Sequence, residues 1–275
     1  MTKPAGTPLR LAVAGLGAIG LEVARRVDAG ALPGLVVAAV SARDLVRAEG
    51  RVAGFARPPR VVPLAALAEA AEVVVECAPA ALFPEIARPA IDRGRIFVPL
   101  SVGALLAHPE LVERARETGA RILVPTGALL GLDAVRAAAE GPVESVRMTT
   151  RKPPRGLQGA PYLLENDISL DGLTEAKLVF SGSAREAARG FPANVNVAAA
   201  LALAGIGPDR TRVEIWADPA VTRNTHTIAV EAEASSFTMS IQNVPSPDNP
   251  ATGRITALSV LATLRRLTEP LVVGT

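Results

Sequence analysis

Three glycines near the start of the chain have the spacing of a phosphate-binding turn. The stretch LAVAGLGAIG, residues 11–20, is an apolar run that ends in a GxGxxG pattern and leads directly into a helical pattern. The first glycine allows the tight turn, the second lets backbone N–H groups approach a pyrophosphate, and the third lets helix and strand pack closely. The expected cofactor contacts here are Gly15, Gly17, Ala18, Ile19 and Gly20. We therefore predict a dinucleotide site, with an ordinary glycine-rich turn as the alternative.

The residues after the second predicted strand bear on the choice between NAD and NADP. That strand is the apolar run Leu35 to Val40. Many NAD-binding units carry Asp or Glu at its end, about 20 residues after the glycines, to bind the ribose. Here Ser41 and Arg43 follow, and a hydroxyl with a guanidinium suits a 2′-phosphate, whereas Asp44 could contact an unphosphorylated ribose. Both cofactors stay open, and a solvated loop charge is the alternative.

The single cysteine of the chain, Cys77, follows the apolar run VVVE in a turn that is expected to face the cofactor together with Ala78. Semialdehyde dehydrogenases use a cysteine nucleophile, which requires an activating base, but no histidine lies nearby in this sequence. We expect Cys77 to have a structural role in the turn. A lone cysteine also excludes an internal disulfide and a cysteine-based metal cluster, and it suits a reducing compartment.

The elements that must position these residues follow two patterns. The first half alternates apolar strands with amphipathic helices, which predicts an α/β, Rossmann-type, doubly wound parallel sheet of about six strands over residues 1–126. The predicted strands after the second are 61–62, 73–76, 96–99 and 121–125, and the predicted helices are 64–71, 84–92 and 111–117.

From about Gly127 the pattern changes, beginning with TGALLGLDAVRAAAE, which we interpret as an interdomain hinge followed by a helix that Asp133 caps. Period-two alternation then predicts a mainly antiparallel sheet in an α+β domain over residues 127–249. Its predicted strands are 143–151, 177–181, 212–217, 225–232 and 236–242. An alanine-rich helix is expected over 192–204, and a C-terminal helix within 250–275 is expected to pack back on the first domain.

Composition limits the partners. Of the 275 residues 49% are apolar, and 29 basic against 27 acidic residues are interspersed, so no charge block indicates nucleic acid or a membrane surface. No apolar run reaches the roughly 20 residues needed to span a bilayer, and the first ten residues are polar, so we expect a cytoplasmic protein. We expect no metal. An apolar exposed face of the second sheet is expected to make a homodimer interface.

Several blocks together resemble the L-aspartate dehydrogenases over nearly the whole chain. They are AGLGAIG, TGALLGLDA, SGSAREAARGFPANVNVAAALALAG, ADPAVTRNTHTIAVE and NPATGRITALSVLATL. The resemblance implies oxidative deamination of L-aspartate, a small dicarboxylic amino acid, with NAD or NADP through iminoaspartate, which some members are thought to supply for NAD synthesis. It also implies that His226, in NTHTI, is the active-site histidine and that Asn196 and Leu130 contact the cofactor.

Basic and amide residues near these blocks are candidates for holding the two substrate carboxylates. Arg151 and Lys152 end a predicted strand and Arg223 precedes NTH, although each could be a solvated surface charge. Asn194, like Asn196, falls at the start of a predicted helix and could bind substrate or only cap the helix.

Two other functions stay in view. One is a non-catalytic NAD(P)-sensing protein, which is expected to lack a titratable group in the substrate cleft. The other is a different two-domain reductase of a small amino acid, such as dihydrodipicolinate reductase or homoserine dehydrogenase. The first of these carries a histidine-rich, lysine-containing motif that is absent from this sequence, and the second usually relies on lysines of its substrate domain.

Overall fold

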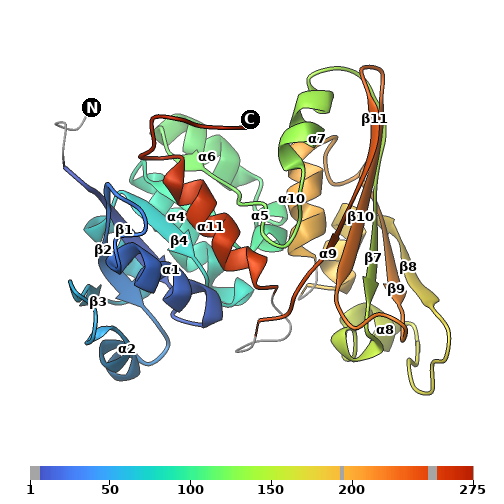
Figure 1. The fold of residues 1–275 in the computed structure, drawn as a ribbon, viewed down its shortest axis with the longest axis horizontal. Coiled ribbons are helices and arrows are strands. Elements are labelled where there is room, and N and C mark those ends of the chain that lie inside the picture. The colour runs from blue at the N-terminus through green and yellow to red at the C-terminus, as the bar shows by residue number, and fades with distance from the viewer. Residues whose placement is uncertain (1–6, 193–194, 247–252, 275) are drawn as a thin grey trace. The chain divides into compact units, whose positions relative to one another are not determined.

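A computed structural model describes residues 7–192, 195–246 and 253–274, and it divides the chain into two compact units (Figure 1). The first comprises residues 1–125 with 257–272, and the second comprises residues 126–256 with 273–275.

The first unit is built on a fully parallel sheet in the order β3-β2-β1-β4-β5-β6. Its strands are β1 (Leu9–Ala14), β2 (Leu35–Ser41), β3 (Arg60–Val61), β4 (Val73–Glu76), β5 (Ile96–Pro99) and β6 (Arg121–Ile122). The strand order reverses between β1 and β4, and in open α/β sheets ligands bind beyond the carboxyl ends of the strands at such a point. The predicted doubly wound fold is confirmed.

Helices cover both faces of this sheet because successive side chains of each strand point to opposite sides. Leu11 and Val13 of β1 belong to the core under α1 (Ala18–Asp28), α2 (Leu45–Val52) and α11 (Ile255–Arg265). Ala12 and Ala14 belong to the core under α3 (Leu67–Ala70), α4 (Phe83–Asp92) and α6 (Glu110–Thr118). Sequence reasoning missed two helices of this unit, α2 and α5 (Val102–Leu106), and made β6 too long.

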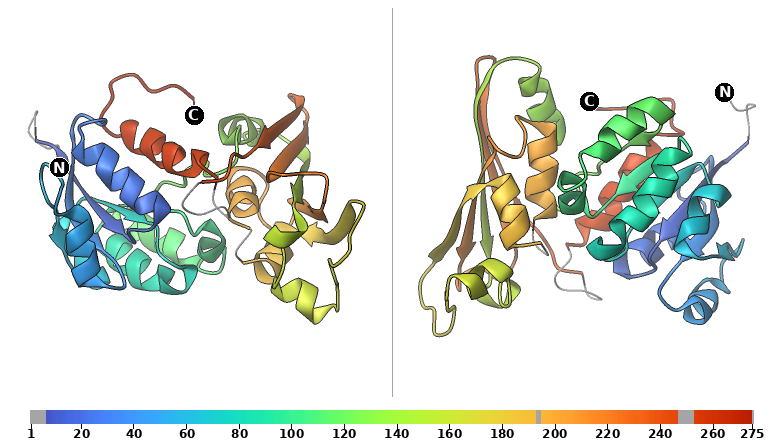
Figure 2. Two further views of the ribbon diagram at one scale, coloured as in Figure 1. Left: turned by 60° about the horizontal axis from the view of Figure 1, so that its bottom comes forward. Right: turned by 180° about the vertical axis from the view of Figure 1, so that it is seen from behind.

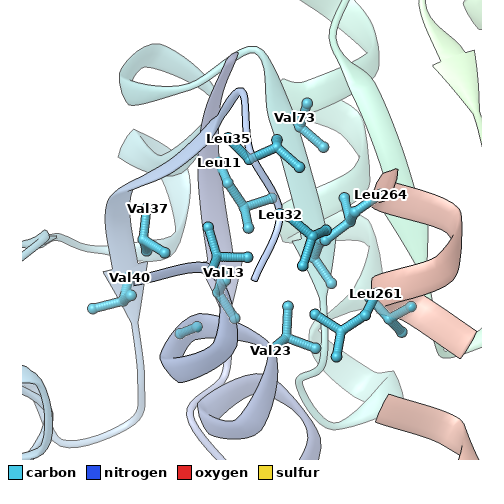
Figure 3. Packing of buried hydrophobic residues seen from close by; sticks show 14 of the residues in the cluster. Leu11, Val13, Val23, Leu32, Leu35, Val37, Val40, Val73, Leu261 and Leu264 are labelled. Carbon is cyan, nitrogen blue, oxygen red and sulfur yellow. The ribbon is translucent and has the colours of Figure 1, made fainter. Parts of the chain in front are cut away.

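The chain returns to this unit at its C-terminal end. Leu261 and Leu264 of α11 pack beside Val13, Val23 and Leu32 (Figure 3). Burying a leucine or valine side chain stabilises the fold by about 1.5–3 kcal/mol relative to leaving it exposed. The apolar side of α11 therefore completes the core over β1.

The second unit contains a mixed sheet in the order β11-β10-β7-β9-β8, in which only the β7 and β9 pair is parallel. Its strands are β7 (Val143–Lys152), β8 (Lys177–Ser183), β9 (Arg212–Ala217), β10 (Thr225–Ala232) and β11 (Ser236–Gln242). The helices α7 (Leu132–Ala139), α9 (Ala184–Gly190) and α10 (Asn196–Ala204) lie on one face of the sheet, and α8 (Pro161–Glu165) lies near the end of β7 (Figures 1 and 2). The predicted α+β unit with a mainly antiparallel sheet is confirmed.

Two details of this unit differ from expectation. Asp133 lies inside the first turn of α7, because Gly131 occupies the N-cap position with a φ of +64°. The short helices α8 and α9 went unpredicted, although Ser183 and Glu186 form a capping box at the start of α9 whose S-x-x-E spacing is visible in the sequence.

The face of the sheet away from the helices carries both polar and apolar side chains, since Leu178 and Trp216 are paired on it beside Arg151. The residues aligned across it by strand register include Thr149, Thr227 and Ser240, and the hydroxyls of Thr227 and Ser240 lie 3.1 Å apart. Most apolar residues of the strands alternate onto the helix-covered face, where they form the core. The expected homodimer stays a prediction.

Candidate functional site

The three glycines of the turn in the first unit differ in what a side chain would meet there. A Cβ on Gly15 would lie 2.6 Å from the backbone oxygen of Cys77, and a Cβ on Gly20 would lie 1.9 Å from the oxygen of Gly15. Both positions therefore require glycine for packing. A Cβ on Gly17 would meet nothing within 4 Å, and Gly17 is the N-cap of α1 with no side chain capping that end. The open helix N-terminus fits the approach of a pyrophosphate, with Ala18 and Ile19 in its first turn.

The end of β2 supports this turn. Ser41 is buried, and its backbone oxygen accepts a hydrogen bond of 2.8 Å from the backbone N–H of Gly15. Arg43 is exposed, whereas Asp44 caps α2 by accepting a 2.9 Å hydrogen bond from the N–H of Arg47. Asp44 thus has a role in the fold, and the contact of Arg43 with a ribose phosphate stays a prediction.

Glu76, at the carboxyl end of β4, is a residue that sequence reasoning missed. Its fully buried carboxylate accepts hydrogen bonds from the backbone N–H groups of Ala78, Leu100 and Ser101, at 3.0, 3.2 and 2.8 Å, and from the Ser101 hydroxyl at 3.0 Å. It therefore joins the loops that follow β4 and β5. Burial raises its pKa, which those hydrogen bonds oppose. The sequence signal that could have identified Glu76 is a glutamate at the end of an apolar predicted strand.

Cys77 packs against the glycine turn through its backbone. Burial, with a smaller effect of the Glu76 charge, raises the pKa of the Cys77 thiol well above its ordinary value. A thiol in this state is a poor nucleophile, which agrees with a structural role for Cys77 in the turn.

His226 in the second unit is buried on the helix-covered face of the sheet, with 3% of its surface exposed. It stands opposite Thr150 across the β7 and β10 pair, and its Nδ1 lies 3.1 Å from Thr150 Oγ1. Burial, followed by the positive charge of Lys152, lowers the pKa of His226 to about 3. An imidazole with this pKa is neutral at pH 7.

Lys152 is the last residue of β7 and is 5% exposed. Burial lowers its pKa to about 8. Because side chains alternate along a strand, Lys152 shares the face of Thr150 and His226, while Arg151 points to the other side. There Arg151 forms an ion pair of 3.1 Å with Asp218, and its guanidinium lies 4.8 Å from the centroid of the Trp216 ring. The two neighbouring basic residues proposed from the sequence thus lie on opposite faces.

The remaining candidates lie around the same unit. Leu130 is half-buried in the turn before α7, Asn196 is exposed at the start of α10, and Arg223 is exposed in the loop before β10. Asn194 lies outside the described residues.

Asn243 is a second residue that sequence reasoning missed. Its Nδ2 donates a 2.9 Å hydrogen bond to the backbone oxygen of Ala128, so it holds the turn that contains Leu130. Its Oδ1 is buried and has no hydrogen-bond partner in the described part of the chain. A buried amide oxygen of this kind can accept a hydrogen bond from a ligand.

The site residues and the fold define a two-domain dehydrogenase that uses a nicotinamide dinucleotide. Within the described ranges, no group of three or more His, Cys, Asp or Glu side chains could hold a metal ion. In the same ranges, no helix is both long and apolar enough to cross a membrane.

Comparison with known proteins specifies the family. Residues 15–125 match the family model described as "Homoserine dehydrogenase, NAD binding domain", and residues 133–267 match "Aspartate dehydrogenase, C-terminal". The chain is 57% identical to L-aspartate dehydrogenase 3 of Bordetella bronchiseptica, covering 97% of this chain and 98% of that protein. It is 55% identical to the L-aspartate dehydrogenase of Bradyrhizobium diazoefficiens, covering 99% and 96%. The chain belongs to the L-aspartate dehydrogenase family.

A solved structure agrees at the level of the fold. The crystal structure of aspartate dehydrogenase from Thermotoga maritima matches with a TM-score of 0.71 at 24% identity, covering 97% of this chain and 99% of that one. The resemblance inferred from the sequence blocks is confirmed by the close relatives, and the NAD-binding domain supports the use of NAD(P).

Proposed function

We propose that this chain catalyses the NAD(P)-dependent oxidative deamination of L-aspartate through iminoaspartate to oxaloacetate and ammonia, or the reverse reductive amination. The observation that carries the proposal is the 57% identity, over 97% of the chain, with a relative named L-aspartate dehydrogenase. The buried Thr150, His226 and Lys152 side chains support it, because a protein that only senses a nucleotide needs no such cluster.

The cofactor, when bound, accepts a hydride from the α-carbon of the substrate. For the cofactor site we propose the glycine turn and the first turn of α1, with the ends of β2 and β4. The residues are Gly15, Gly17, Ala18, Ile19, Gly20, Ser41, Arg43, Cys77 and Ala78. Leu130 and Asn196 are proposed as further cofactor contacts on the ground of the family resemblance alone. The space above Gly17 and the uncapped helix end support this assignment.

For the chemistry we propose that His226 contacts the substrate as a neutral imidazole. Its Nδ1 faces Thr150, which leaves Nε2 as the ring nitrogen that can bind the substrate nitrogen or the attacking water. A fixed hydrogen bond of this kind orients the water that converts the imine to the keto acid.

For the substrate carboxylates we propose Arg223, whose exposed guanidinium can bind a carboxylate through two hydrogen bonds. Arg151 would first have to leave Asp218, so its proposed role as an anchor has less support. We further propose a cytoplasmic homodimer in which iminoaspartate can be supplied for NAD synthesis.

The test is a screen of the twenty amino acids with NAD and with NADP, following the absorbance of the reduced cofactor. L-Aspartate is expected to be oxidised far faster than the other amino acids. Turnover of a different amino acid with aspartate inert would reject the substrate. Binding of NAD(P)H without turnover of any amino acid would favour the sensing function.

A further inference from the structure

The helix-covered face of the second sheet holds two nitrogen bases next to one another. Thr150 stands opposite His226 in the strand register, and Lys152 follows Thr150 by two residues on the same face. Such diagonal neighbours in an antiparallel pair have Cα atoms about 7–8 Å apart, which a lysine side chain can span. The electrostatic effect of Lys152 on His226 agrees with this closeness.

Two elements next to the pair carry charged groups among the described residues. Lys152 pairs with Ala217 of β9 in the register, and the Asp218 carboxylate that follows is bound to Arg151. Burial is the cause of the lowered pKa of Lys152, and burial together with the charge of Lys152 is the cause for His226. An amine in such surroundings loses its proton more easily than an exposed lysine.

The proposed reaction needs a group that can both take up and release a proton near neutral pH. His226, with a pKa of about 3, cannot hold a proton at that pH. Lys152 is the neighbouring group on the same face, and its pKa of about 8 lies in the useful range.

We propose that Lys152 is the proton acceptor and donor of the deamination, and that neutral His226 positions the water for it. This inference rests on the proposed function. It differs from the view of Lys152 as a fixed positive charge that anchors a substrate carboxylate.

Lys152 gives back every proton that it accepts, so it is unchanged at the end of the reaction. Hydride transfer leaves an iminium ion, and as the water oxygen bonds to its carbon, the C=N pair moves to nitrogen and a water proton passes to the Lys152 amine. The Lys152 ammonium returns that proton to the amino nitrogen, and the C–N bond breaks as C=O forms. Lys152 then carries the hydroxyl proton to the departing ammonia. The sum is iminium plus water giving keto acid plus ammonium, with Lys152 unchanged.

Two substitutions separate a proton acceptor from a fixed charge. Arginine keeps the positive charge but cannot lose its proton in a protein, and methionine removes the charge at similar length. In the proposal, Lys152→Arg and Lys152→Met both lower kcat by roughly 10²–10⁴, the usual worth of general acid–base catalysis. The wild-type kcat is expected to rise with pH through a midpoint near 8, and both variants are expected to lose that rise. Lys177→Arg, at an exposed site, is the matched control and keeps both rate and profile.

A second measurement does not depend on turnover. The sequence contains only three lysines, Lys3, Lys152 and Lys177, so protein labelled with 13C at the lysine ε-carbon should give three resolvable signals. The signal that disappears in Lys152→Met is expected to titrate near pH 8 in the wild type without substrate.

Each outcome of these experiments either supports or overturns the proposed role of Lys152. A Lys152 midpoint near 10.5, or a Lys152→Arg variant within threefold of the wild-type kcat, overturns the proposal. A wild type that oxidises no amino acid refutes the proposed function itself, whatever the midpoint, and the inference then falls with it. A midpoint near 8 with two equally impaired variants supports it.

Discussion

Replacing Lys152 by methionine should stabilise the second unit at neutral pH while it impairs turnover. Holding the charged amine in the fold costs free energy, because burial lowers its pKa from 10.5 to about 8. One pKa unit corresponds to about 1.4 kcal/mol, so the charged form destabilises the fold by about 3 kcal/mol at pH 7. Methionine has a similar length and carries no charge, so the variant should be more stable by up to this amount.

Most substitutions lower the stability of a protein, whereas this one should raise it, and the size of the stability gain should depend on pH in a defined window. The folded pKa lies below the unfolded one, so the unfolded state binds more protons and the wild type gains stability as pH rises from about 8 to about 10.5. The advantage of the variant should therefore shrink from about 3 kcal/mol at pH 7 to about 1 kcal/mol at pH 9.5.

The assay is urea unfolding followed by tryptophan fluorescence at several pH values. Trp216, the only tryptophan, lies on β9, so it reports on the second unit. Lys177→Met at an exposed site is the control and should change stability by no more than about 0.5 kcal/mol. A Lys152→Met variant that is less stable than the wild type at pH 7, or a difference that does not vary with pH, would refute the reasoning.

Four further predictions concern the cofactor and the site. Gly17→Val should weaken NAD(P)H binding, measured by cofactor fluorescence, and leave thermal stability nearly unchanged; equal binding by this variant and the wild type would place the nucleotide elsewhere. Gly20→Ala, in contrast, should lower stability, because its Cβ would meet the Gly15 oxygen at 1.9 Å. Arg43→Ala should weaken NADP by about 1.5–3 kcal/mol and spare NAD, and equal losses in the two Kd values would reject a 2′-phosphate contact. Glu76→Gln should destabilise the first unit by at least about 2 kcal/mol and weaken cofactor binding, because an amide NH2 cannot accept the hydrogen bonds that one carboxylate oxygen accepts. Unchanged hydrogen exchange at the backbone N–H groups of Ala78 and Ser101 would contradict this. His226→Asn should lower kcat by roughly 10² with the pH midpoint still near 8, and a midpoint that moves with the substitution would return the titrating role to His226.

The sequence by itself determined the fold class and the glycine turn. Strand and helix periods are local properties of the chain, and a GxGxxG turn needs only neighbouring residues, so both could be predicted without coordinates. The family blocks around Asn196 and His226 likewise depend on order along the chain. The family that they indicate agrees with the close relatives.

The chemical state of the site was decided only by the tertiary structure. Thr150 and His226 are 76 residues apart in sequence, and their pairing depends on how β7 and β10 align. The pKa values of His226 and Lys152 depend on burial under helices that come from other parts of the chain. The Glu76 carboxylate likewise acquires its role only when β5 brings Ser101 beside it. Alternation along β7 could have assigned Arg151 and Lys152 to opposite faces of the sheet. Which face is buried depends on where the helices pack, and a residue pattern does not contain that long-range packing.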